Sequence, residues 1–137
     1  MPISSSKPRL KLGFKSKSLL TRFSRVVVRG ESMAPTLVAG DRLFVLQRCR
    51  TYVVGDIIVF ANASQPYIKR VVGVPGQHVE WHGIPWQLAA DEYFALGDCE
   101  TVSIDSRTFG PIPHCNIIGR AIIKYFPTIS WLQRSRP

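Results

Sequence analysis

Short β-like runs separated by turn residues make up most of the chain from residue 24 onward, and they limit the folds open to it. The runs are rich in Val, Ile, Phe and Tyr and are bounded by Gly, Pro, Asn and Asp, a composition typical of strands. The expected strands span residues 24–29, 42–47, 56–61, 66–74, 77–81, 92–96 and 116–126. Only residues 10–23 have any helical character. Seven short strands without a strong helix predict a single, mainly β domain, either a barrel or a sandwich.

The positive charge lies mostly at the N-terminal end. The 137 residues carry 18 Lys and Arg against nine Asp and Glu, and residues 1–29 contain eight of these bases and no acid. The rest of the chain is therefore nearly neutral. We expect a basic, flexible arm at residues 1–23, a β domain at 24–127 and a polar tail at 128–137 that frays.

The basic arm has three possible interpretations: a solubilising tail, a nucleic-acid contact, or a weak peripheral contact with an anionic membrane surface. Nucleic acid is not an expected partner, because the β domain is nearly neutral and lacks a strand face that combines basic and aromatic residues. No apolar region follows the charges as in a signal peptide, and no segment has the roughly 18–20 apolar residues that span a bilayer. The sequence predicts a cytoplasmic protein, peripheral to a membrane at most, with no transmembrane helix.

The cysteines and histidines do not indicate a metal site. Cys49, Cys99 and Cys115 are odd in number and widely spaced, which favours reduced thiols over a disulfide framework or a zinc site. His78 and His82 are four residues apart, but the sequence around them is typical of strand and turn, so we do not expect them to share a face. No metal and no cofactor is expected.

Candidate chemistry is concentrated in four segments: "GESMAPTL" (30–37), "GDIIVF" (55–60), "YIKRVVGVPGQ" (67–77) and "LGDCETVSIDSRTFGPIP" (96–113). A serine hydroxyl needs an adjacent base to act as a nucleophile at neutral pH, and no histidine is placed for an evident Ser-His-Asp triad. Lys69 lies in an apolar run, where desolvation would lower its pKa enough for it to serve as that base. From the residues alone, two other interpretations stay open: Ser32 as an ordinary turn residue, and Lys69 as a solvated residue on a half-exposed strand.

Three of these segments resemble, in the same order, the motifs of the signal peptidase I family of serine/lysine leader peptidases. The sequence "SMAPTL" is similar to the nucleophile box, "IKRVVGVPG" to the general-base box and "GDCETVSIDSRTFGPIP" to the loop that completes the site. The resemblance extends from about Val26 to Pro127. It implies a serine endopeptidase that removes an N-terminal leader from a precursor protein, with Ser32 as the nucleophile and Lys69 as the general base.

The resemblance also implies supporting roles for residues around the dyad. Ser103 would hydrogen-bond the Lys69 amine and hold it in place. Two arginine–carboxylate pairs would brace the loop under the dyad, since the guanidinium fork fits a carboxylate in a fixed geometry. The expected pairs are Asp98 with Arg70 and Asp105 with Arg107.

Two positions depart from the family's pattern. The oxyanion hole would use the backbone N–H of Ser32, often helped by a hydroxyl two residues earlier, where this sequence has Gly30. A backbone N–H or a water would have to replace that donor, since losing one donor costs about 10²–10³ in rate. Cys99 stands where an asparagine usually follows the Gly-Asp pair, and we interpret it as a structural substitute.

The resemblance further implies a shallow apolar pocket that favours small side chains just before the cut. The matching residues are Val28, Met33, Leu37, Tyr67 and Ile68. The leader would bind extended, as an added strand beside the one that carries Lys69 and the segment before Ser32.

The lysine box and the "GDCE" loop are only about 20 residues apart, which leaves no room for a cap domain. In this respect the chain resembles the short peptidases that mature nickel-type superoxide dismutase, which implies that precursor as the substrate. A general signal peptidase acting on exported pre-proteins is the alternative. Self-cleaving repressors resemble the same Ser/Lys fold, but the roughly 25 residues before the β domain are too few for their helix-turn-helix domain.

Overall fold

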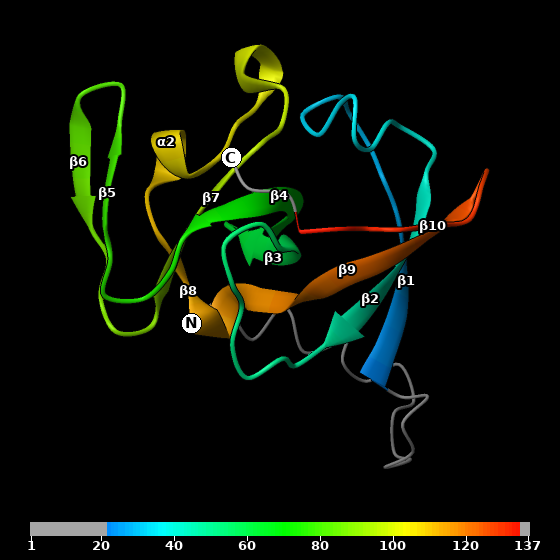
Figure 1. Ribbon diagram of the computed structural model, residues 1–137, viewed down its shortest axis with the longest axis horizontal. Coiled ribbons are helices and arrows are strands. Elements are labelled where there is room, and N and C mark those ends of the chain that lie inside the picture. The colour runs from blue at the N-terminus through cyan, green and yellow to red at the C-terminus, as the bar shows by residue number, and fades with distance from the viewer. Residues whose placement is uncertain (1–21, 135–137) are drawn as a thin grey trace.

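The computed structural model describes residues 22–134. The predicted basic arm, residues 1–23, and the segment expected to have helical character, residues 10–23, therefore lie almost wholly outside the described residues. Antiparallel strands dominate the described part (Figure 1). They are β1 (Phe23–Val27), β2 (Arg42–Gln47), β3 (Ile57–Asn62), β4 (Gln65–Gly73), β5 (His78–Trp81), β6 (Ile84–Gln87), β7 (Glu92–Leu96), β8 (Ile112–Pro113), β9 (Ile117–Phe126) and β10 (Ser130–Trp131). The helical segments are short: η3 (Glu100–Val102), α2 (Ser106–Phe109) and η4 (His114–Asn116). No helix within residues 22–134 is long and apolar enough to cross a membrane.

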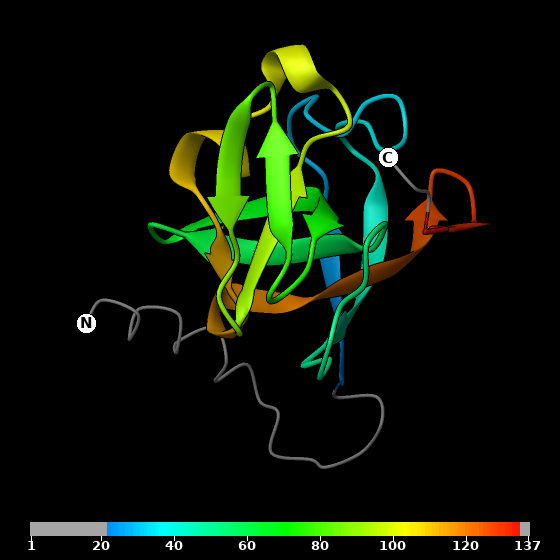
Figure 2. The ribbon, with the colours of Figure 1, turned by 60° about the vertical axis from the view of Figure 1, so that its left-hand side comes forward.

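The prediction of one mainly β domain is confirmed, and each of the seven expected strands is present with its ends shifted by at most two residues. The main sheet has the order β1-β2-β9-β3-β4-β7-β8, with β10 beside the far end of β9. This order is open across the described residues, so the domain is a sandwich-like fold rather than a closed barrel. Between β4 and β7 the chain forms only the β5–β6 hairpin, a separate two-stranded sheet that faces the viewer in Figure 2.

The prediction that the polar tail frays is wrong for residues 130–134. Strand β10 pairs with β9, and Leu132 donates its N–H to the carbonyl of Ile122. Arg134 then contacts the buried carboxylate of Asp56. The tail is ordered because β9 extends past the end of β3 and leaves an edge free for pairing. Composition alone did not reveal this edge.

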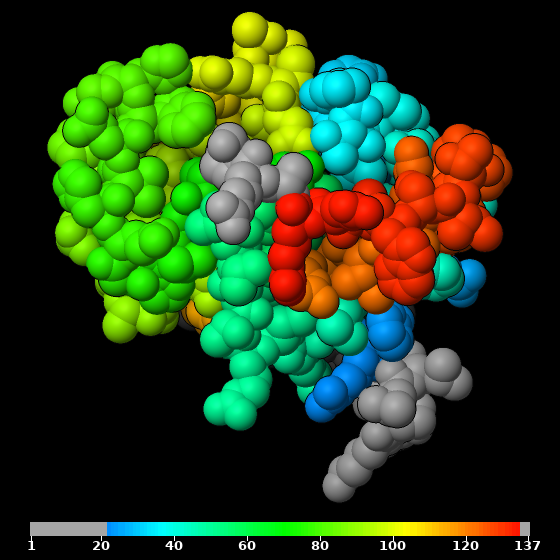
Figure 3. Space-filling model, in the orientation of Figure 1, coloured from blue at the N-terminus to red at the C-terminus, as the bar shows by residue number. Residues whose placement is uncertain are grey.

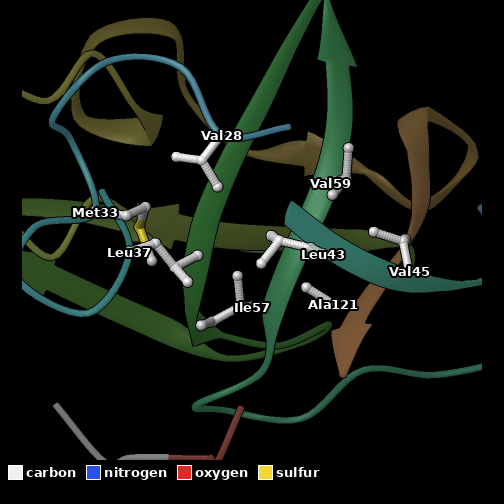
Figure 4. Close-up of a cluster of buried hydrophobic side chains, with 8 residues drawn as sticks. All are labelled: Val28, Met33, Leu37, Leu43, Val45, Ile57, Val59 and Ala121. Atoms are coloured by element: carbon white, nitrogen blue, oxygen red, sulfur yellow. The ribbon is translucent and has the colours of Figure 1, made fainter. Parts of the chain in front are cut away.

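The core lies on both sides of β3, whose side chains alternate between two apolar clusters. Ile57 and Val59 belong to the first cluster, and Ile58 and Phe60 to the second. Figure 4 shows the first cluster, which joins strands β2, β3 and β9 to the segment after β1. Its buried members are Val28, Met33, Leu37, Leu43, Val45, Ile57, Val59 and Ala121.

Candidate active site

Ser32 lies in a tight turn between β1 and β2, which is held to the core by its neighbours. Met33 and Leu37 are 1% and 0% exposed, and both belong to the first core cluster (Figure 4). The N–H of Leu37 donates to the carbonyl of Met33 at 2.9 Å and closes the turn. Because Met33 and Leu37, which follow Ser32, are buried, Ser32 itself is held half-buried at the surface.

Lys69 comes to Ser32 from β4. Its Nζ donates a hydrogen bond to Ser32 Oγ at 2.7 Å, and the residue is only 4% exposed. In the strand register Lys69 stands opposite Ile58 of β3, on the same face of β4 as Tyr67. The Lys69 Nζ lies 5.5 Å from the centroid of the Tyr67 ring. The interpretation of Lys69 as a solvated strand residue is therefore wrong.

Two opposing influences act on the pKa of Lys69. Burial lowers it, because a desolvated ammonium is disfavoured, and the negative charge of Asp105 raises it. Burial is the larger effect, so the pKa of Lys69 lies below its ordinary value of 10.5. A lysine in this state carries a neutral amine more often, and its lone pair can accept the proton of the Ser32 hydroxyl.

Both expected arginine–carboxylate pairs are present. Arg70 donates to Asp98 through Nε at 2.8 Å and through NH2 at 2.7 Å. Arg107 donates to Asp105 in the same two-point way, at 2.9 and 2.8 Å. Burial tends to raise the pKa of both carboxyls, but hydrogen bonds that include those from the arginines hold each pKa below its ordinary value. Both carboxylates therefore stay ionised at neutral pH.

Ser103 does not hydrogen-bond Lys69 as expected. Its Oγ donates instead to Asp105 Oδ2 at 2.6 Å, and no hydrogen bond joins Ser103 to Lys69 within residues 22–134. Asp105 is 0% exposed, and a buried carboxylate requires several donors. It takes the Ser103 hydroxyl, two residues away in the same loop, together with the N–H of Gly97 at 2.9 Å. The link from Ser103 to Lys69 is thus indirect and runs through the charge of Asp105.

The loop from Gly97 to Asp105 packs directly against the nucleophile turn. The N–H of Cys99 donates to the carbonyl of Ser32 at 2.8 Å. A Cβ at Gly97 would lie 2.6 Å from that same carbonyl oxygen and closer still to Ser103 Oγ, so only glycine fits there without displacement. Figure 3 shows the two segments side by side at the top of the molecule, in cyan and yellow. The Cys99 thiol faces Thr101 Oγ1 at 3.8 Å, so the backbone of Cys99 makes the contact with Ser32.

Gly30 has a φ of +76°, which favours glycine, and a Cβ there would meet nothing within 4 Å. A serine at position 30 would therefore have space but a strained backbone. The N–H of Ser32 has no hydrogen-bond acceptor in the described part of the chain. It is free to donate to an oxyanion, but Gly30 supplies no side-chain donor.

The five residues of the expected substrate pocket differ in how exposed they are. Val28, Met33 and Leu37 are buried in the core cluster and do not reach the surface, because they anchor the nucleophile turn. Their contact with a substrate stays a prediction. Tyr67 and Ile68 are half-buried and remain accessible beside Lys69.

One edge of β4 is free next to Lys69. Strand β3 pairs with β4 from Gln65 to Arg70, but β7 pairs with the other edge only from Arg70 to Gly73. Residues 67–69 therefore have no partner strand on the β7 side within residues 22–134. A free strand edge is a template for an added strand.

Sequence reasoning missed Thr36. Its Oγ1 donates to Asp98 Oδ2 at 2.6 Å, the same oxygen that Arg70 contacts. An exposed threonine after a proline in a turn carries no signal of such a contact. No group of three or more His, Cys, Asp or Glu side chains in residues 22–134 is arranged to hold a metal ion, and the three thiols are free.

Known proteins share this sequence pattern. Residues 18–85 and 83–126 match the family described as signal peptidase, peptidase S26. The probable signal peptidase I-1 of Synechocystis sp. is 35% identical over 155 aligned residues, which cover 85% of this chain and 79% of that protein. Signal peptidase I of Leptolyngbya laminosa is 32% identical, with 73% of this chain and 67% of that protein covered. Signal peptidase I of Bacillus caldolyticus is 30% identical, with 77% and 80% covered.

Proposed function

This chain belongs to the signal peptidase family, peptidase S26, a family of serine-type endopeptidases, and we propose that it removes N-terminal leaders from precursor proteins with a Ser32–Lys69 dyad. The observation that carries this proposal is the 2.7 Å hydrogen bond between Lys69 Nζ and Ser32 Oγ, made by a lysine that is 4% exposed. A buried amine with a lowered pKa, placed against a serine hydroxyl, meets the two requirements of a nucleophile and its base.

The reaction follows from this geometry. Neutral Lys69 takes the hydroxyl proton as Ser32 Oγ attacks the scissile carbonyl, and the Ser32 N–H donates to the oxyanion that forms. The Lys69 ammonium then returns the proton to the leaving amine, which departs and leaves an acyl-enzyme. Water, deprotonated by Lys69, attacks the ester and releases the N-terminal product, and Ser32 regains its proton.

The surrounding residues act as supports in this proposal. The Arg70–Asp98 pair fixes β4 at the position directly after Lys69, and Arg107 fixes Asp105. Asp105 moderates the lowering of the Lys69 pKa, and Ser103 holds the Asp105 carboxylate in place. Each support acts through geometry or charge and does not touch the reacting atoms.

The leader binds as an extended strand on the free edge of β4, beside residues 67–69 and the segment before Ser32. Strand addition supplies main-chain hydrogen bonds, while Tyr67 and Ile68 contact the side chain next to the cut. A small side chain fits best there, because the deeper residues of the expected pocket are already packed in the core.

The precursor of a nickel-type superoxide dismutase is the substrate we propose first, because the motif layout and the short spacing between lysine box and loop resemble the peptidases that mature it. Exported pre-proteins are the alternative substrates. The relatives named signal peptidase I support this alternative, which is as well supported as the first proposal.

Co-expression with each kind of precursor, read by the intact mass of the precursor's N-terminus, separates the two substrates. Loss of the leader from the superoxide dismutase precursor alone supports the first, and loss from an exported pre-protein supports the second. The Ser32→Ala variant is the matched control for cleavage by host enzymes, and processing that persists with it would refute the proposed dyad.

A further inference from the structure

We propose that Thr36 is a positioning residue of the dyad, because its hydroxyl ties the nucleophile turn to the carboxylate that also holds the base-bearing strand. The inference rests on the proposed function of Ser32 and Lys69. Thr36 touches neither reacting atom, so any effect it has on the reaction must act through the position of Ser32.

The contact is short and charge-assisted. Thr36 Oγ1 donates to Asp98 Oδ2 at 2.6 Å, and the same oxygen accepts Arg70 NH2 at 2.7 Å. Arg70 also donates from Nε to the other oxygen of Asp98 at 2.8 Å, and from NH1 to the carbonyl of Gly55 at 2.9 Å. The Asp98 side chain is 17% exposed, so water competes only weakly for it. Asp98 is therefore a fixed point to which the turn can be attached.

The turn meets the loop at two places. The carbonyl of Ser32 accepts a hydrogen bond from the N–H of Cys99 at 2.8 Å. The hydroxyl of Thr36 donates to the carboxylate of Asp98, the residue before Cys99 in the loop. Met33 and Leu37 anchor the turn in the core, and the two hydrogen bonds at separated positions fix its orientation relative to the loop. Thr36 supplies the second of these bonds.

Asp98 joins the two halves of the dyad through this arrangement. Thr36 connects it to the turn that carries Ser32, and Arg70 connects it to β4 directly after Lys69. The distance from Lys69 Nζ to Ser32 Oγ is thereby set through one shared carboxylate. Loss of the Thr36 hydroxyl removes one of the two hydrogen bonds between the turn and the loop, but leaves the Arg70–Asp98 pair and the buried anchors Met33 and Leu37 in place.

The test compares Thr36→Val, which keeps the branched shape and removes the donor, with Thr36→Ser, which keeps the donor. Thr51→Val is the matched control, since Thr51 is exposed and its side chain has no hydrogen bond to any residue in 22–134. The readouts are kcat and KM on a leader-bearing peptide, and hydrogen exchange of the Cys99 amide, which reports the same junction without a substrate.

We expect Thr36→Val to lower kcat roughly three- to tenfold with KM unchanged, and to speed exchange of the Cys99 amide by a similar factor. Thr36→Ser should stay within about twofold of wild type in both readouts, and Thr51→Val should match wild type. Unchanged kcat and exchange in Thr36→Val, or equal losses in Thr36→Ser, would overturn the inference. If wild type cleaves no leader, the proposed function fails, and the exchange rate still decides whether Thr36 holds the turn.

Discussion

Replacement of Gly97 by alanine tests whether the contact between the loop and the nucleophile turn sets the rate. A Cβ at Gly97 would lie 2.6 Å from the carbonyl oxygen of Ser32, whereas ordinary contacts of this kind begin at 3.4 Å. One of the two segments must therefore move by about 0.8 Å. The Ser32 carbonyl cannot move by that much and keep its 2.8 Å hydrogen bond from Cys99.

The expected loss of activity follows from this displacement. A shift approaching 1 Å at a reacting group costs up to about 10²-fold in rate, so we expect kcat of Gly97→Ala to fall by about 30- to 100-fold. Overpacking should also destabilise the fold by about 1–3 kcal/mol, because the added methyl group has no space. The assay is kcat on a leader-bearing peptide at a temperature where thermal unfolding curves show that each variant is folded.

Gly119→Ala is the matched control. A Cβ at Gly119 would collide with the carbonyl oxygen of Leu46, so this variant carries a comparable backbone clash where β2 meets β9. We expect it to lose stability but to keep the kcat of the folded protein. A Gly97→Ala variant with wild-type kcat, or equal losses of kcat in both variants, would refute the idea that the loop positions Ser32.

Three further predictions concern the dyad and the arm. Ser32→Ala and Lys69→Ala should each abolish cleavage without unfolding the chain, read by product mass and by circular dichroism; normal processing by either variant would exclude the dyad. Under conditions where chemistry limits the rate, activity should rise with pH as Lys69 loses its proton. The midpoint of this rise should lie below pH 10.5, because burial lowers the pKa of Lys69. A flat profile from about pH 6 to 9 would count against a lysine base. Removal of residues 1–22, which ends just before β1, should leave hydrolysis of a short soluble peptide intact and weaken binding to anionic vesicles; complete loss of hydrolysis would place the arm in the active fold.

The strands could be predicted because each is a local run of β-formers ended by turn residues. Strand β3 is an example, since its apolar residues are buried on both faces and the run is continuous. Strands β8 and β10 could not be predicted, because each is only two residues long and forms where a neighbouring strand leaves an edge open. Such pairing depends on the assembled sheet and leaves no pattern in the segment itself.

The family motifs predicted which residues form the site. They did not predict which hydrogen-bond partner each of these residues has or which of them are buried. The motif placed Ser103 near Lys69. It did not show that Asp105, fully buried and two residues away, would accept the hydrogen bond of the Ser103 hydroxyl. The same limit applies to the expected pocket, because the motif did not show that Met33 and Leu37 would be buried in the core cluster, where they anchor the turn. A sequence motif shows which residue types lie at a site, but not which of them are exposed to a substrate in the folded protein.

The pKa of Lys69 depends on its burial and on the charge of Asp105. Burial alone would favour the neutral amine, but a very weak base is also a poor proton acceptor in the reaction, so efficiency requires a pKa near the working pH. Asp105 supplies the opposing charge, and it can do so only while it is ionised. Arg107, Ser103 and the N–H of Gly97 keep it ionised by donating to its two oxygens, and they lower its pKa against the effect of burial. The loop that follows Leu96 thus has two effects on the dyad, since Cys99 holds the carbonyl of Ser32 and Asp105 limits how far the pKa of Lys69 falls. A change in this loop should therefore alter both the geometry and the pH dependence of the reaction, even where it leaves Ser32 and Lys69 unchanged.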